Sequence, residues 1–208
     1  MKPNIRDRAA RRSNADMSAE TQAKSIEAAI ASLAEHGYAG TTMSGIAHRV
    51  GVSRAALIYH FQSKNALMAA VINAIYDELE TLYRSAAHPS LTPAEQVLAI
   101  FEASYRHTGS VGQMAQIELL LAARRDPEFR AEVAPAIEAR DRAFQAYWRA
   151  LVDLLGGNPE RLNLLRDFAV SVFRGITICR SLGNDTASFE RQNTLLRMLL
   201  LDALIERS

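Results

Sequence analysis

Residues 37–67 read GYAGTTMSGIAHRVGVSRAALIYHFQSKNAL, and this stretch carries the most specific pattern in the chain. Thr42 and Ser53 are placed to cap two short helices, and Gly51 between them can form a left-handed turn at no steric cost. The small Ala47 allows the two helices to cross closely. The remaining apolar positions form the expected internal core: Ile46, Val50, Val52 and Leu57. The pattern therefore predicts a helix-turn-helix, whose second helix can enter the major groove of DNA.

The second helix of this motif would present its first residues to the edges of the bases. Arg54 can donate two hydrogen bonds to a guanine, and Ala55 or Ala56 can contact the methyl group of a thymine. Small helical bundles also contain the Ala-x3-Gly spacing by chance. That spacing alone leaves a purely structural interpretation open.

The distribution of charge favours an anionic partner. The formal net charge is +1, but residues 1–70 hold nine Lys and Arg against five Asp and Glu, and no acid occurs from His36 to Tyr76. Residues 1–18 contain five bases, two acids and few large apolar side chains, so we expect a disordered basic arm. Its arginines either track DNA or belong to a solvated tail; these are Arg6, Arg8, Arg11 and Arg12.

The rest of the chain predicts an all-α fold of about nine helices. Ten Gly and six Pro are few for 208 residues, and Gly37 ends a periodic helix over residues 20–36. A long helix is expected after Ser63, and Thr92-Pro93-Ala94-Glu95 is a capping box. Residues 195–205, LLRMLLLDALI, are apolar nearly all round, so this helix is either central or covered by a second subunit. We favour a homodimer formed through the last two helices.

Several other classes of protein are not expected. No long uncharged apolar run predicts a membrane span, and the first residues lack the apolar core of a secretory signal, so we expect a cytoplasmic protein. The single Cys179 allows neither an internal disulfide nor a cysteine zinc cluster. The histidines lack the spacing of metal ligands, and no phosphate-binding loop or Gly-x-Ser-x-Gly motif occurs. We therefore expect no metal, cofactor or catalytic residues.

Residues 37–67 closely resemble the DNA-binding domain of the tetracycline-repressor (TetR) family of transcriptional regulators. With the helix before them, the resemblance covers about residues 20–70. After the expected disordered arm over residues 1–18, it implies a helix-turn-helix domain over 19–66 and an effector-binding and dimerisation domain over 67–208. The matching positions are Gly37, Tyr38, Thr41, Thr42, Ile46, Ala47, Gly51, Val52, Ser53, Leu57, His60, Phe61, Ser63, Lys64 and Leu67.

The resemblance also implies which residues contact DNA. Thr42 would offer its backbone N–H to a phosphate, and Lys64 would bind a phosphate from the first turn of the long helix. The full implied set is Thr42, Ser44, Ser53, Arg54, Ala55, Ala56, Tyr59, His60 and Lys64. The chain departs from the family at Ile58, where a tyrosine is usual, and at Ala55-Ala56, where Gly-Thr or Pro-Thr is common.

The function implied is a repressor that binds a palindromic operator as a dimer and is released by a small-molecule effector of unknown identity. Our candidates for the effector cavity are also explained by ordinary core packing: Tyr83, Phe101, Tyr105, Gln116, Tyr147, Trp148 and Phe173. Two alternatives remain. One is an activator or effector-independent regulator that acts through a protein partner, and the other is a helical enzyme with an accidental motif.

Overall fold

The computed structural model describes residues 5–156, 158–183 and 186–205, with side chains from residue 16 onward. All regular secondary structure in these ranges is helical, which confirms the predicted all-α fold. The nine helices are α1 (Ile5–Gly40), α2 (Met43–Val50), α3 (Arg54–Phe61), α4 (Lys64–Ala86), α5 (Pro93–His107), α6 (Val111–Arg125), α7 (Pro127–Leu155), α8 (Pro159–Ser181) and α9 (Thr186–Ile205).

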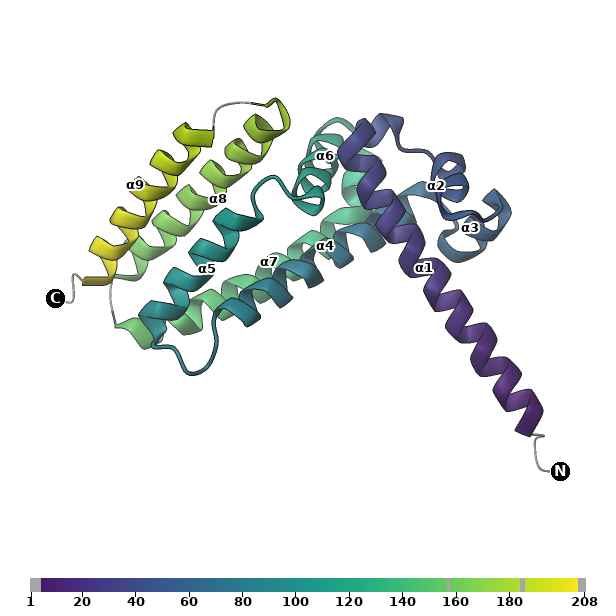
Figure 1. The fold of residues 1–208 in the computed structure, drawn as a ribbon, viewed down its shortest axis with the longest axis horizontal. Helices are drawn as coiled ribbons and strands as arrows, with labels where there is room; N and C mark the ends of the chain where they lie inside the picture. The colour runs from purple at the N-terminus through teal and green to yellow at the C-terminus, as the bar shows by residue number, and fades with distance from the viewer. Residues whose placement is uncertain (1–4, 157, 184–185, 206–208) are drawn as a thin grey trace.

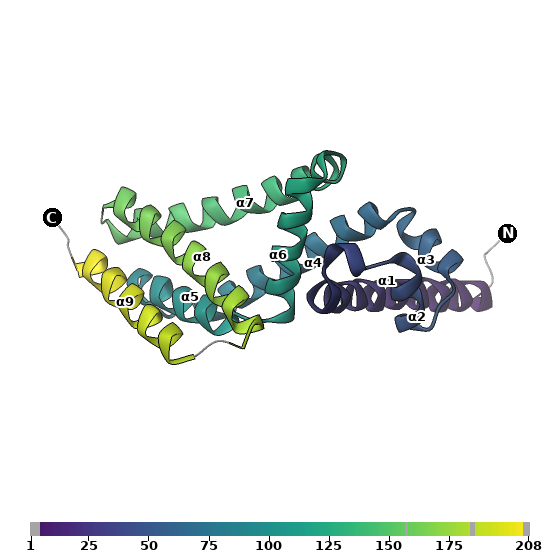
Figure 2. The ribbon, with the colours of Figure 1, turned by 90° about the horizontal axis from the view of Figure 1, so that it is seen from above.

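The helices form an elongated molecule whose chain termini lie at opposite ends (Figures 1 and 2). Helices α2 and α3 lie beside α1 at one end, and α8 and α9 lie side by side at the other. Helices α4 and α7 pack along each other and connect the two ends, while α6 packs against α1 between them. Helix α4 therefore carries the chain from the helix-turn-helix into the C-terminal bundle.

Helix α1 corrects the expected disordered arm. The structure describes residues 5–18 as helix continuous with the predicted segment over residues 20–36, and residues 1–4 lie outside the described part. No Gly or Pro occurs between Ile5 and His36, and the alanines and arginines there are strong helix formers. Extending an existing helix is easier than starting a new one, so the packed C-terminal half supports the first turns. The helix bends at Gly37, whose φ of 68° and ψ of 175° are accessible mainly to glycine.

Two apolar cores hold the fold together. The first joins the helix-turn-helix to the N-terminal half of α4 and to α6 and α7, through side chains such as Leu33, Leu57, Leu67 and Phe129. The second lies between α5, the C-terminal half of α7, α8 and α9. The first core extends well beyond residue 66. The orientation of the helix-turn-helix is consequently fixed by packing against α4, α6 and α7.

The predicted helix starts at Ser63 and Thr92 are confirmed. Ser63 Oγ accepts a hydrogen bond from the backbone N–H of Ala66, 3.0 Å away, at the start of α4. Thr92 and Glu95 form both hydrogen bonds of a capping box at the start of α5, 2.8 and 3.3 Å long. These local bonds satisfy backbone N–H groups that no helix can pair internally.

Candidate nucleic-acid interface and ligand cavity

The helix-turn-helix forms as its sequence predicts. Thr42 Oγ1 accepts from the N–H of Gly45 at 3.1 Å, and Ser53 Oγ accepts from the N–H of Ala56 at 3.1 Å. Gly51 adopts the left-handed conformation with φ 77° and ψ 28°. The core of the motif contains the predicted apolar residues: Ile46, Ala47 and Leu57 are buried, and Val50 and Val52 are partly buried against them.

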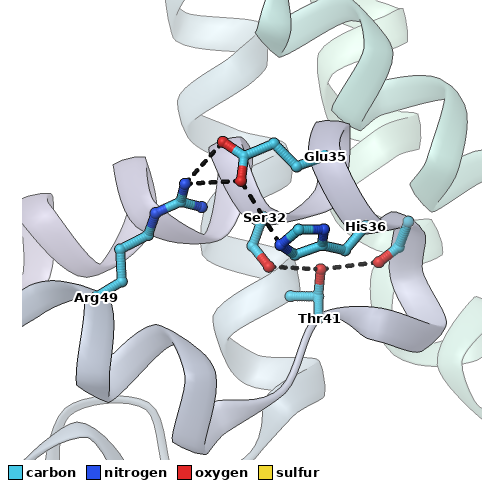
Figure 3. A network of polar contacts seen from close by, with 6 residues as sticks. Ser32, Glu35, His36, Thr41 and Arg49 are labelled. Atoms are coloured by element: carbon cyan, nitrogen blue, oxygen red, sulfur yellow. Dashed lines mark hydrogen bonds and ion pairs between the residues drawn. The ribbon is translucent and has the colours of Figure 1, made fainter.

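Buried polar contacts also connect α1 to the start of α2. Thr41 is fully buried; its hydroxyl donates to the carbonyl of Gly37 at 2.8 Å and lies 3.1 Å from Ser32 Oγ (Figure 3). Thr42, the next residue, is the N-cap of α2. The bend at Gly37 is thus tied directly to the position at which α2 begins.

Helix α3 presents one uncovered face to solvent. Arg54 and Ala55 are exposed, and Tyr59 is 84% exposed on the same short helix. The Arg54 side chain makes no hydrogen bond or ion pair with any described residue, so its guanidinium is free to bind another molecule. Of the other predicted DNA-contacting residues, Thr42, Ser44 and Ser53 are exposed, and Ala56 and His60 are half-buried.

The acid that directly precedes the acid-free segment is neutralised within the protein. Glu35 of α1 accepts two hydrogen bonds from Arg49 Nη2, both 2.7 Å long, and Glu35 Oε2 lies 3.6 Å from His36 Nε2 (Figure 3). Arg49 is therefore engaged with α1. This pairing leaves Arg54 as the unpaired arginine of the helix-turn-helix.

Lys64 lies at the start of α4, but its ammonium group contacts the protein. Lys64 Nζ donates to the carbonyl oxygen of Tyr38 at 2.6 Å and lies 3.8 Å from the centre of the Tyr38 ring. Burial lowers the pKa of Lys64 below its ordinary value. The sequence motif gave no sign of this contact, which joins residues 26 positions apart.

A second candidate site is a cavity of about 260 Å³ inside the C-terminal bundle. Its walls come from α4 to α9, and six of the seven predicted residues line it: Tyr83, Phe101, Gln116, Tyr147, Trp148 and Phe173. Tyr105 does not line it. The Tyr105 ring instead packs against Phe173, with ring centres 6.0 Å apart, and the guanidinium carbon of Arg180 lies 5.3 Å from the centre of the Tyr105 ring.

One part of the cavity wall is polar, and sequence reasoning found only Gln116 there. Tyr76 donates from its hydroxyl to Asp141 Oδ1 at 3.2 Å, and burial together with that carboxylate raises the pKa of Tyr76 to about 12. Burial lowers the pKa of His107, which lies 3.0 Å from Ser110 Oγ. The remainder of the wall is mostly apolar. Such a cavity suits a small molecule with an apolar body and a few polar groups.

The outer face of α8 and α9 is an exposed apolar surface. The inner face of α8 includes Leu162, Ala169 and Ile176, which are buried. A different set of apolar side chains is exposed on the two helices: Leu164, Phe168, Ile178, Leu182, Leu195, Met198 and Ile205. These residues define the outer α8–α9 face. Helix α9 is consequently apolar on both sides, although this chain covers only one of them.

Two absences hold within the described ranges of the chain. No helix there is long and apolar enough to cross a membrane. In the same residues, no group of three His, Cys, Asp or Glu side chains gathers as metal ligands would.

The chain is similar to known transcriptional regulators. Residues 26–71 match the model of the bacterial regulatory proteins of the tetR family. The chain is 26% identical over 182 residues to the HTH-type transcriptional regulator CymR of Pseudomonas putida, covering 87% of this chain and 89% of the relative. It is 37% identical over 59 residues to the biofilm operon icaADBC HTH-type negative transcriptional regulator IcaR of Staphylococcus aureus, covering 28% and 32% of the two chains.

Its fold is also similar to that of a solved transcriptional regulator from Rhodococcus sp. Rha1. The TM-score is 0.69 at 20% identity, and the similarity covers 88% of this chain and 95% of that one. The likeness thus includes the C-terminal bundle as well as the helix-turn-helix.

Proposed function

Because the chain belongs to the TetR family of DNA-binding transcriptional regulators, we propose that it is a repressor that binds a palindromic operator as a homodimer and is released by a small molecule. The observation that carries this proposal is the uncovered face of α3. Its exposed Arg54, Ala55 and Tyr59 lie in a segment without acids, and a buried core holds the helix rigidly. Such a regulator acts in the cytoplasm, where bacterial DNA lies.

The DNA contacts divide into two kinds. Arg54, Ala55, Ala56 and Tyr59 are proposed to contact bases, because the N-terminal part of a recognition helix reaches deepest into the groove. The other proposed contacts are to the phosphate backbone and position the helix without reading sequence; they come from Thr42, Ser44, Ser53 and His60.

The homodimer is proposed to form through the outer α8–α9 face. Leu164, Phe168 and Ile178 of α8 and its C-cap residue Leu182 are spaced as on one helical stripe, and they would be buried against the same stripe of a second chain. A dimer with two-fold symmetry presents two copies of α3. Two such helices read half-sites separated by about one turn of DNA, roughly 34–36 Å, which requires a palindromic operator.

The effector is proposed to bind in the 260 Å³ cavity. It would release DNA because it binds more tightly to a dimer in which the two copies of α3 have the wrong separation. Helix α4 supports this idea, because its residues Tyr76 and Tyr83 line the cavity and its first turn lies beside the helix-turn-helix. The relatives are transcriptional regulators, and we propose no catalytic role for this chain.

The test is selection of DNA from a random-sequence library by the full chain, followed by a gel-shift titration. We expect a palindromic consensus and binding that weakens as salt rises. Failure to enrich any sequence would refute the proposal. A screen of small molecules against the purified complex then separates a ligand-released repressor from a regulator that acts through a protein partner. Trp148, the single tryptophan, lines the cavity, so its fluorescence reports binding directly.

A further inference from the structure

Tyr38 lies near the C-terminal end of α1 and contacts three other helices, α4, α6 and α7. Its backbone N–H donates to Glu118 Oε2 of α6 at 3.4 Å, and its carbonyl accepts from Lys64 of α4 at 2.6 Å. Its hydroxyl donates to Asn65 Oδ1 at 3.3 Å, and its ring packs on Phe129 of α7 with ring centres 4.8 Å apart. The peptide, ring and hydroxyl of one residue are thus all engaged.

Tyr38 is connected to the helix-turn-helix through the bend at Gly37. Tyr38 follows the bend at Gly37, and Gly37 accepts hydrogen bonds from both the N–H and the hydroxyl of Thr41. The residue after Thr41 is the N-cap of α2. A displacement of Tyr38 would therefore move the start of α2, and α3 with it, because their shared core is closely packed.

Tyr38 is also connected to the cavity, through Glu118 of α6. Glu118 lies two residues after Gln116 on α6, and Gln116 lines the cavity wall. A helix transmits displacement along its length, so a shift of Gln116 is expected to be felt at Glu118. The carboxylate of Glu118 also touches the bend itself, because a Cβ atom added to Gly37 would lie only 3.0 Å from Glu118 Oε2.

We propose that Tyr38 is the positioning residue that sets the orientation of α2 and α3, and that Glu118 and Lys64 hold it from the cavity side and the DNA side. Lys64 acts here through Tyr38 and not as a phosphate ligand. The regulatory part of this inference rests on the proposed effector function, whereas the orienting part does not. The partial burial of Lys64, which also lowers its pKa, supports an internal role.

The first experiment needs neither DNA nor effector. Spin labels at His48→Cys on α2 and Leu121→Cys on α6, in a Cys179→Ser chain diluted with unlabelled protein, report the distance between the two helices. Both labelled positions are exposed. We expect a narrow distance distribution with Glu118 intact, a broader one in Glu118→Ala, and recovery in Glu118→Gln, whose amide oxygen can still accept from Tyr38. An unchanged distribution in Glu118→Ala would overturn the proposal.

The second experiment uses the DNA selected by the wild-type chain. We expect Glu118→Ala and Lys64→Met to bind it about tenfold more weakly, the size expected when one hydrogen bond to a charged group is lost. The slope of log affinity against log salt should stay unchanged in Lys64→Met. A slope reduced by about 0.9 would instead identify Lys64 as a phosphate ligand and refute its internal role. If the wild-type chain bound no DNA while Glu118→Ala still broadened the distance distribution, the proposed function would be refuted and the orienting role of Tyr38 would stay supported.

Discussion

The guanidinium of Arg49 and the carboxylate of Glu35 form a pair with two hydrogen bonds of 2.7 Å, and this pair joins α2 to α1. Both side chains are more than two-fifths exposed, so the pair contributes little to stability, on the order of 0–1 kcal/mol. Its electrostatic consequence is larger, because it neutralises the acid that directly precedes the acid-free segment.

The first prediction concerns that acid. Arg49→Ala would leave Glu35 unneutralised near the DNA, so we expect DNA affinity to fall several-fold while the free energy of unfolding changes by less than about 1 kcal/mol. The double variant Glu35→Gln/Arg49→Ala should regain most of the affinity. Titration of the selected DNA at low salt checks this, and equal losses in the single and double variants would contradict it.

The second prediction concerns base recognition. Arg54→Ala should relax the preference for one base in each half-site by about 1–3 kcal/mol of discrimination. Arg142→Ala on α7 removes the same charge from an exposed position outside the motif and serves as the matched control. Affinities for a set of singly substituted operators decide the matter. An unchanged base preference in Arg54→Ala would show that α3 docks differently.

The third prediction concerns assembly. A charge on the outer α8–α9 face, as in Leu195→Glu, should convert the proposed dimer to a monomer, because the interface would bury a carboxylate that has no partner. Leu154→Glu changes a leucine that is 71% exposed on α7 and should leave the dimer intact. Light scattering during size-exclusion chromatography measures the mass. Dimers in both variants would rule out this face.

The fourth prediction concerns pH. Burial holds the pKa of His107 below its ordinary value of 6.5, so the unfolded chain takes up a proton there before the folded chain does. The contribution of His107 to stability is therefore complete above about pH 6.5 and is lost as the pH falls through the lowered pKa. His107→Asn should lose less stability than the wild type between pH 7.5 and 5. Urea unfolding at both pH values measures it, and parallel losses in the two proteins would contradict the assignment.

Local chemistry explains what could be predicted from the sequence. Thr42, Ser53, Ser63 and Thr92 each bond to a backbone group three residues away, so short patterns were enough to locate the helix starts. Six cavity residues followed from their aromatic or amide character on apolar helix faces, a feature that could not separate Tyr105 from them.

The missed features all depend on contacts between distant parts of the chain. Tyr76 meets Asp141 across 65 residues, and the N–H of Tyr38 meets Glu118 across 80. No local pattern encodes which helix will lie against which side chain. The helical state of residues 5–18 was missed for a different reason, because a charged segment can be helical when it continues a helix that is already packed.

Helix α3 divides its eight residues between two tasks that scarcely interfere. Leu57 and Phe61 are buried in the core, while Arg54, Ala55 and Tyr59 face outward and contribute little to folding. Substitutions at such exposed positions usually change stability by no more than about 0.5 kcal/mol. The chain can therefore acquire a new operator over evolutionary time by changing a handful of surface residues, and every intermediate on the way would still fold. A gene duplicate could in this way come to control different genes while it keeps the same bundle and the same cavity.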